Sequence, residues 1–307
     1  MRIVFMGTPE FAVPSLNILL ENNYEIPFVV TVPDKPKGRG LQMQFSDIKN
    51  FALKKGLDIL QPEFLKDVSF IEQIKSVNPD LIVVVAFRIL PKEVFSIPKH
   101  GSFNLHASLL PRYRGAAPIN HAIINGDKVT GVTTFFLQDK VDTGNIILQK
   151  SIPIELSDNA GTLHDKLALL GSEAVLETVK LINTGNYSLQ TQDDSLANKA
   201  PKIFKNDCRI NWNQSSEKIF NFIRGLSPYP AAFTTFQNKQ VKIFSSNLTS
   251  ESSSDPPGRL LISRNKLFAN TQDNLLEICE LQLEGKKRIS SSDFINGLKT
   301  YYFHFFS

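Results

Sequence analysis

The stretch of sequence that decides the fold is residues 80–87, which read DLIVVVAF. After Asp80 the run is apolar without interruption, and this predicts a strand that is buried on both faces of a sheet. Helical patterns precede it at Asp47–Lys55 and Leu65–Val77, and a β-rich run lies earlier at Ile26–Val32. Buried strands that alternate with helices are typical of α/β proteins, so we expect an open, mostly parallel sheet.

The same alternation continues toward both ends of the chain. Residues Arg2–Met6 and Ser102–His106 predict two more strands. Two later β runs, Val129–Leu137 and Asn145–Ile154, lie close enough in sequence to pair antiparallel, and Thr162–Ile182 predicts a long amphipathic helix. These elements extend the expected α/β sheet well beyond the central strand.

A change of pattern divides the chain. Residues 183–204 are polar and lack periodicity, which is typical of a linker. After one helical pattern at Ser216–Arg224 come five short β runs separated by turns, which suit a small β-barrel like the OB-fold. We therefore expect a first domain over residues 1–182 and a barrel over residues 205–307, with an exposed loop at Thr249–Pro257.

Charge is distributed unevenly between these parts. The 307 residues include 34 Lys and Arg and 30 Asp and Glu, a net charge of +4. Residues 1–198 have a net charge of −2, and residues 199–307 have a net charge of +6. A basic module attached to a nearly neutral one suggests a polyanionic partner, although charge alone fits a solvated surface without a partner equally well.

Composition narrows the class of protein further. With 42% hydrophobic and 21% charged residues, the chain is typical of folded proteins rather than disordered ones. Its two cysteines, Cys208 and Cys279, exclude a disulfide scaffold and a multi-cysteine zinc site. No apolar run is long enough for a membrane span, and no export signal begins the sequence. We expect a cytoplasmic protein with no metal and no membrane partner.

The residues best suited to chemistry lie on the expected strand Ser102–His106. Asn104 and His106 are two positions apart, so their side chains share one face near the strand's carboxyl end, where α/β sheets bind ligands. In acyl transfer an amide can hold a developing oxyanion while an imidazole handles a proton. Asp142 is the candidate carboxylate to orient the imidazole. A structural histidine and an ordinary Asp-Thr-Gly turn are the alternative interpretation.

Several segments, in order along nearly the whole chain, resemble the methionyl-tRNA formyltransferase family. The Asn-x-His and SLLP signature, which follows Phe103, is shared by the wider group of formyltransferases that use formyltetrahydrofolate, so it indicates the reaction rather than the acceptor. The basic loop near Arg39 and the module after the linker indicate tRNA. The matching segments read FMGTPEFAVPSL (5–16), FNLHASLLPRYRGAAPI (103–119), VDTGNI (141–146), IRGLSPYPAA (223–232) and LEGKKRISSSDFING (283–297).

The resemblance implies a Rossmann-like formyltransferase domain and a particular reaction. The formyl group of 10-formyltetrahydrofolate would pass to the α-amino group of methionyl initiator tRNA, for translation initiation. Asn104 would donate a hydrogen bond to the oxyanion, and His106 would stabilise it or shuttle protons. Asp142 would orient His106 and assist removal of the amine proton; which of these two is the base stays open.

The resemblance also implies binding residues for both substrates, in a protein that we expect to be a monomer. Trp212 and Tyr229 are expected in the core rather than as platforms for bases. The folate-binding candidates are Ser108, Leu109, Leu110, Pro111 and Phe87. The tRNA-binding candidates are Lys35, Lys37 and Arg39, in a loop over Asp34–Gln44, together with Lys286, Lys287 and Arg288.

Two departures from the family pattern flank the expected folate pocket. Relatives usually carry glycine where this chain has Arg88 and Lys140, and loss of glycine from a left-handed position would strain the backbone. These departures motivate one alternative, a tRNA-binding protein with impaired catalysis. Because the catalytic trio does not choose the acceptor, a formyltransferase acting on a sugar-nucleotide or glycinamide ribonucleotide amine is the other alternative.

Overall fold

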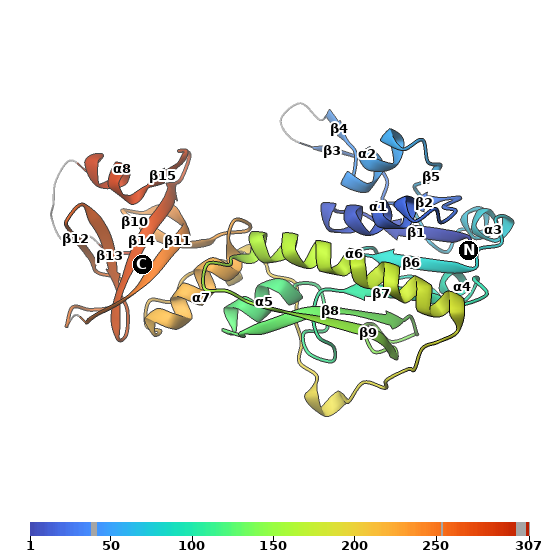
Figure 1. Cartoon of the computed structure of the whole chain (residues 1–307). Helices are drawn as coiled ribbons and strands as arrows, with labels where there is room; N and C mark the ends of the chain where they lie inside the picture. The colour runs from blue at the N-terminus through green and yellow to red at the C-terminus, as the bar shows by residue number, and fades with distance from the viewer. Residues whose placement is uncertain (38–41, 253, 299–304, 307) are drawn as a thin grey trace. The chain divides into compact units, whose positions relative to one another are not determined.

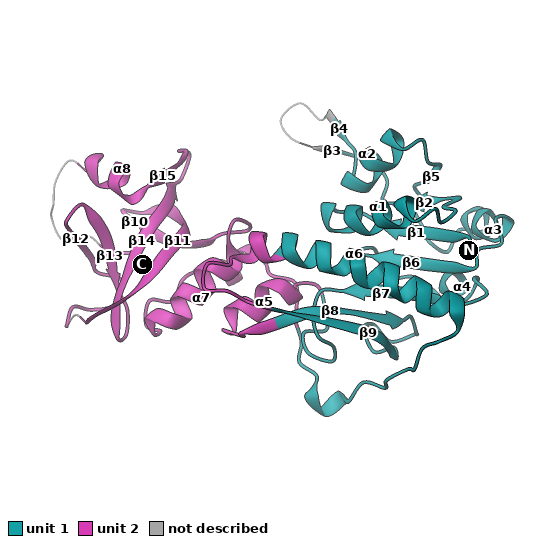
Figure 2. Ribbon diagram, viewed as in Figure 1, with its two compact units in different colours: residues 1–115, 130–152, 164–199 teal, residues 116–129, 153–163, 200–307 magenta. Residues whose placement is uncertain are grey.

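A computed structural model describes residues 1–37, 42–252, 254–298 and 305–306 of the chain (Figure 1). The chain forms two compact units, each with a hydrophobic core of its own. In Figure 2 the first unit comprises residues 1–115, 130–152 and 164–199, and the second comprises residues 116–129, 153–163 and 200–307.

The first unit is built on a seven-stranded sheet of order β5-β2-β1-β6-β7-β8-β9. The neighbours from β5 to β7 pair parallel, whereas β8 pairs antiparallel with β7. Every residue of β6 is buried, as the apolar run predicts, and the expected open, mostly parallel sheet is confirmed. The strands are β1 (Ile3–Gly7), β2 (Val29–Val30), β5 (Ile59–Leu60), β6 (Leu81–Val85), β7 (Ser102–His106), β8 (Val129–Phe136) and β9 (Ile146–Pro153).

Helices pack against this sheet through their apolar faces. Phe70 and Ile74 of α3 join Val4, Ile82 and Val84 of the sheet in one cluster. The expected long helix is confirmed as α6, of which residues 164–184 belong to the first unit. The helices are α1 (Val13–Glu21), α2 (Asp47–Lys54), α3 (Val68–Ser76), α4 (Lys92–Phe95) and α6 (Ala160–Thr184).

The segment between β2 and α2 differs from the expectation of a loop. Strand β3 (Lys35–Lys37) pairs antiparallel with β4 (Gln42–Gln44), so Asp34–Gln44 contains a hairpin. Its Pro and Gly content indicated only a turn, because pairing across a short connection depends on the partner strand and leaves little local pattern. The loop prediction is wrong for the two strands, and residues 38–41 lie outside the described part.

The second unit combines an antiparallel sheet of order β10-β11-β14-β13-β12, to which β15 adds on β14, with the helices α5, α7 and α8. The second domain, expected as a small β-barrel like the OB-fold, is confirmed as a domain of antiparallel strands. The helices are α5 (Pro118–Ile124), α7 (Ser216–Leu226) and α8 (Ser291–Asn296). The strands are β10 (Ala232–Phe236), β11 (Lys239–Ser252), β12 (Leu260–Ser263), β13 (Lys266–Asn270), β14 (Asn274–Leu283) and β15 (Arg288–Ser290).

Strand β11 is longer than the apolar pattern indicated. It continues through Ser252, which pairs with Asn274 of β14, so the loop expected at Thr249–Pro257 is wrong for its first four residues. This end of β11 is polar and largely exposed, and β14 rather than burial supplies the pairing. The sequence patterns also missed β15 and α8, where the Ser290 side chain caps the helix by accepting from the Asp293 amide.

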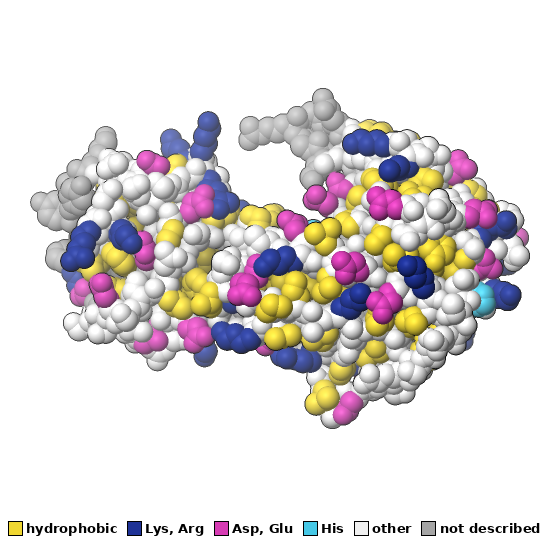
Figure 3. Space-filling model, in the orientation of Figure 1, with side chains coloured by type: hydrophobic (Ala, Val, Ile, Leu, Met, Phe, Trp, Pro, Cys, Tyr) yellow, Lys and Arg dark blue, Asp and Glu magenta, His cyan; other side chains and the backbone are white. Residues whose placement is uncertain are grey.

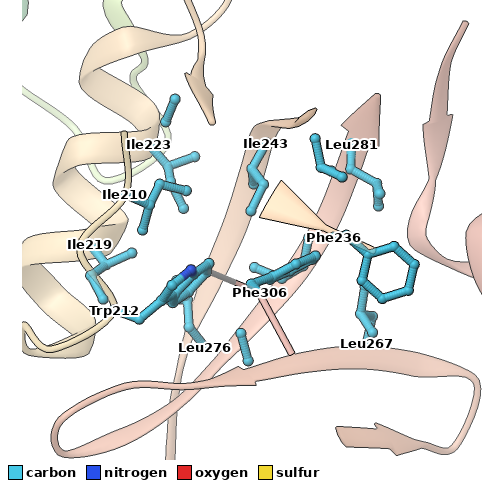
Figure 4. Packing of buried hydrophobic residues seen from close by; sticks show 14 of the residues in the cluster. Ile210, Trp212, Ile219, Ile223, Phe236, Ile243, Leu267, Leu276, Leu281 and Phe306 are labelled. Atoms are coloured by element: carbon cyan, nitrogen blue, oxygen red, sulfur yellow. The ribbon is translucent and has the colours of Figure 1, made fainter. Parts of the chain in front are cut away.

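The core of the second unit is organised around one tryptophan (Figure 4). Trp212 stacks on Phe306 with ring centroids 5.5 Å apart, and its Nε1 donates to Thr234 Oγ1 at 3.0 Å. The expectation that Trp212 is core is therefore confirmed. The same expectation is wrong for Tyr229, which is 82% exposed at the turn after α7.

No helix in the described ranges is long and apolar enough to cross a membrane.

Candidate active site

Strand β7 presents Asn104 and His106 at the carboxyl end of the parallel sheet. Asn104 lies beside Val84 of β6, and His106 lies opposite Thr133 of β8. The side chain of Asn104 is half-buried and makes no hydrogen bond to any residue that the structure describes. Its amide is therefore available to a ligand, as the sequence pattern predicts for an oxyanion donor.

His106 is buried and held through one ring nitrogen. Its Nε2 lies 2.8 Å from the carbonyl oxygen of Tyr113, and only 6% of the residue is exposed. A carbonyl oxygen can only accept, so Nε2 carries the hydrogen in this contact. Tyr113 itself has left-handed backbone, with φ of 60°. The imidazole is thus fixed in orientation by the loop that follows it.

Asp142 lies in the turn after β8 and is linked to the same loop. Its Oδ2 accepts from the Gly115 amide at 2.9 Å, and its backbone has a left-handed φ of 56°. Among the described residues no hydrogen bond joins Asp142 to His106. The connection between the two side chains is therefore indirect, through the segment Tyr113–Gly115.

The segment Ser108–Pro111 is a rigid loop. Ser108 Oγ donates to the Arg112 carbonyl at 2.6 Å, and Thr133 Oγ1 accepts from the Leu110 amide at 3.0 Å. Gln149 Nε2 donates to the Leu110 carbonyl at 2.9 Å. Ser108 and Leu110 are buried, so Leu109 and Pro111 are the two residues of this loop with accessible side chains.

Phe87, the remaining folate candidate, follows β6 and lies against Arg88. The Arg88 guanidinium is 5.2 Å from the ring centroid of Phe87 and donates to the carbonyls of Pro62 and Glu63 at 2.7 and 2.9 Å. Burial lowers the pKa of Arg88. These bonds tie the end of β6 to the segment after β5 and leave Phe87 half-buried.

The backbone strain expected where glycines are replaced lies elsewhere. Neither Arg88 nor Lys140 has positive φ, so neither position requires a glycine. Left-handed backbone lies two residues away from each of them instead, at Ala86, with φ of 48°, and at Asp142, with φ of 56°. The two substitutions therefore leave the backbone of the candidate site unstrained at their own positions.

The tRNA candidates fall in both units. Lys35 is exposed on β3, Lys37 ends that strand, and Arg39 lies outside the described residues. In the second unit Lys and Arg side chains gather over the turn between β14 and β15 (Figure 3). Lys286 and Lys287 are exposed there and form no ion pair with a described residue, whereas Arg288 pairs with Glu280 and lies 4.2 Å over the Phe244 ring.

Sequence reasoning missed a polar cluster at the base of the β3–β4 hairpin. Lys49 Nζ donates to Asp34 Oδ2 at 2.5 Å and to Gln61 Oε1 at 2.7 Å, and Gln61 Nε2 donates to Asp34 Oδ1 at 2.8 Å. The hydrogen bonds from Lys49 and then Gln61 hold the pKa of Asp34 below its usual value. The three residues are far apart in sequence, so no spacing signal marks them.

Sequence reasoning also missed Gln192 and Asn198, which contact the turns around Asp142 and Tyr113. Both lie in the polar segment that was expected to be a linker, and a single Gln or Asn in such a segment carries no signal of its own. In the part of the chain that the structure describes, no group of three or more His, Cys, Asp or Glu side chains could hold a metal ion.

Comparison with known proteins identifies the family of the chain. Residues 1–179 match the family described as Formyl transferase, and residues 202–299 match Formyl transferase, C-terminal domain. The fold and the two matching family models thus define an enzyme of the formyltransferase class. The chain is 48% identical to methionyl-tRNA formyltransferase of Flavobacterium johnsoniae over 303 residues, covering 97% of this chain and 96% of the relative. It is 49% identical to that of Chlorobium luteolum, covering 97% of both. The chain belongs to the methionyl-tRNA formyltransferase family.

Solved structures share the fold at lower identity. The N-formyltransferase from Helicobacter canadensis, in complex with folinic acid and dTDP-3-aminofucose, has a TM-score of 0.67 and 22% identity, covering 94% of this chain and 99% of that one. HypX from Aquifex aeolicus, in complex with tetrahydrofolic acid, has a TM-score of 0.66 and 18% identity, covering 100% of this chain and 51% of that one. These likenesses support the fold.

Proposed function

We propose that this protein transfers the formyl group of 10-formyltetrahydrofolate to the α-amino group of methionyl initiator tRNA, for translation initiation in the cytoplasm. The observation that carries the proposal is the identity of 48–49% over nearly the full length of relatives named for this activity. The half-buried Asn104 amide and the fixed His106 imidazole supply the chemistry that such a transfer needs.

The reaction forms one C–N bond and breaks another. The methionyl nitrogen attacks the formyl carbon and gives a tetrahedral oxyanion, to which the Asn104 amide donates a hydrogen bond. Nδ1 of His106 is the ring nitrogen left for proton exchange, because Nε2 is held by the Tyr113 carbonyl. The amine proton leaves to His106 or Asp142, and N10 of the folate takes a proton as its bond to the formyl carbon breaks.

The donor would bind along the loop Ser108–Pro111. The accessible side chains of Leu109 and Pro111, together with the half-buried ring of Phe87, offer the apolar surface that a flat pterin requires. The hydrogen bonds that hold Ser108 and Leu110 make this surface preformed. These residues therefore fit a folate, whose formyl group is the group to be transferred.

The tRNA would bind through basic residues that neutralise phosphates. We assign residues 1–182 to catalysis and 205–307 to tRNA binding, with residues 183–204 connecting the two along the sequence, in a monomer. Contacts of this kind give affinity and steering rather than base readout. The residues assigned to tRNA binding are Lys35, Lys37, Arg39, Lys286, Lys287 and Arg288.

A formylation assay with a choice of acceptors tests the proposal. Purified protein and 10-formyltetrahydrofolate are mixed with methionyl initiator tRNA, a dTDP-linked amino sugar or glycinamide ribonucleotide, and formylated products are measured. We expect product on the charged initiator tRNA. Preferred formylation of either small amine would refute methionyl initiator tRNA as the acceptor. Binding of tRNA by folded protein without any product would instead identify a tRNA-binding protein that has lost catalysis.

A further inference from the structure

Residues 192–198, which we call the strap, lie in the polar segment expected to be a linker and yet belong to the first unit. The chain on either side of the strap is bonded to that unit. Gln190 exchanges backbone hydrogen bonds of 2.8 and 3.0 Å with Ile146 of β9, and the backbone of Lys199 forms an isolated parallel β-bridge with that of Arg114. The strap is therefore fixed beside the loops that carry the candidate catalytic residues.

The side chain of Gln192 is the centre of the strap. It is 8% exposed, and its Nε2 donates to the backbone carbonyls of Asp142 at 3.0 Å and Gly144 at 2.9 Å. Its Oε1 accepts from Nε and Nη2 of Arg114 at 3.0 and 2.7 Å. Carbonyls only accept and a guanidinium only donates, so these partners admit one orientation of the amide.

Further hydrogen bonds connect this centre to His106. The Asn198 carbonyl accepts from the Arg114 amide at 3.1 Å, and Asn198 Oδ1 accepts from the Tyr113 amide. The Tyr113 carbonyl holds His106 Nε2 at 2.8 Å. Asp142 and His106, which share no direct bond, are thus joined through the strap by a continuous set of hydrogen bonds.

We infer that Gln192 is a positioning residue that holds Asp142 and His106 in register for formyl transfer. The inference rests on the proposed function of those two residues. Left-handed backbone at a residue with a side chain persists only where its surroundings hold it, and Gln192 bonds the carbonyls on both sides of Thr143 in the turn that contains Asp142. Without that amide the carboxylate of Asp142 loses its fixed relation to the Tyr113–Gly115 loop.

Two substitutions of Gln192 separate positioning from bulk stability. Gln192→Glu keeps an acceptor for Arg114 but removes both donors to the turn, and Gln192→Leu removes all four bonds. We expect kcat to fall about 10- to 100-fold in both variants, with KM for both substrates within about twofold of wild type. Gln190→Leu is the matched control, because that side chain is exposed and its backbone bonds remain. Wild-type kcat in Gln192→Glu would overturn the inference.

A double-mutant cycle with Asp142→Asn tests whether Gln192 acts through Asp142. If it does, Gln192→Leu reduces kcat far less in the Asp142→Asn background than in wild type; equal reductions in both backgrounds would refute the inference. Amide hydrogen exchange at Thr143 and Gly144 gives a second readout, which we expect to accelerate in Gln192→Leu and not in Gln190→Leu. Wild-type protein that formylates no tRNA would refute the proposed function. Unchanged hydrogen exchange at Thr143 and Gly144 in Gln192→Leu would instead refute the role of Gln192 in holding the turn.

Discussion

The two units hold their candidate functional residues in different ways. In the first unit the His106 imidazole and the Asp142 carboxylate are fixed by hydrogen bonds to backbone groups of the segment Tyr113–Gly115. In the second unit Lys286 and Lys287 are exposed on a turn that an apolar core supports. Groups that act on reacting atoms must be held within fractions of an ångström, whereas charges that attract a polyanion act over several ångströms. Substitutions at the candidate catalytic residues of the first unit should therefore reduce turnover, and substitutions at Lys286 and Lys287 should reduce affinity.

The largest expected effect is on the core of the second unit. Trp212→Ala removes a buried ring that stacks on Phe306 and donates to Thr234, so we expect the free energy of unfolding of this unit to fall by about 3–5 kcal/mol. Urea unfolding followed by circular dichroism measures it. Tyr229→Ala is the matched control, since Tyr229 is 82% exposed, and it should change stability by less than about 0.5 kcal/mol. Equal losses in the two variants would contradict the assignment of the core.

The next effect is on turnover in the first unit. Asn104→Ala removes the amide proposed to hold the oxyanion, and we expect kcat to fall about 10²- to 10³-fold while tRNA affinity is kept. Steady-state formylation kinetics and a filter-binding assay measure the two quantities. Asn50→Ala on α2 is the control, because Asn50 is exposed and away from β7. If Asn104→Ala lost affinity for tRNA and kept kcat, the assignment of Asn104 to turnover rather than to tRNA binding would be wrong.

The sheet of the first unit was predictable because burial leaves a strong pattern. The side chains of β6 are apolar on both faces of the strand. This pattern is typical of a central strand in a sheet that has helices packed on both faces. Side chains point to alternate faces along a strand, so the sequence predicted that Asn104 and His106, two positions apart, share one face. Their place at the carboxyl end of β7 then followed from the topology of α/β sheets.

Other features depended on contacts that leave no local pattern. Gln192 donates a hydrogen bond to Asp142, which lies 50 residues earlier in the sequence. Nothing in the polar sequence around Gln192 distinguishes it from Gln190, whose side chain is exposed. The polar end of β11 becomes a strand because β14 pairs with it. Tyr229 resembles a core aromatic by residue type alone, and only the fold leaves it exposed.

The basic turn of the second unit should give smaller, salt-dependent effects. Lys286→Ala and Lys287→Ala should each raise KM for tRNA several-fold, leave kcat unchanged and lower the slope of log affinity against log salt by about one. Binding titrations at several salt concentrations measure the slope. Arg288→Ala should have a smaller effect, because Arg288 is already paired with Glu280. A larger effect for Arg288 than for the two lysines would contradict this ranking.

The smallest effect concerns pH at the base of the β3–β4 hairpin. Hydrogen bonds from Lys49 and Gln61 lower the pKa of Asp34, so its carboxylate favours the folded hairpin base above the unfolded carboxyl pKa of about 3.9. That contribution is lost as pH falls through the lower, folded-state pKa. An NMR titration of the Asp34 carboxyl should show a midpoint below that of the unfolded chain in wild type. Lys49→Met should raise this midpoint, because it removes the main cause of the shift, whereas Lys54→Met on the exposed side of α2 should leave it in place. An unchanged midpoint in Lys49→Met would contradict the assignment of Lys49 as the main cause of the lowered pKa of Asp34.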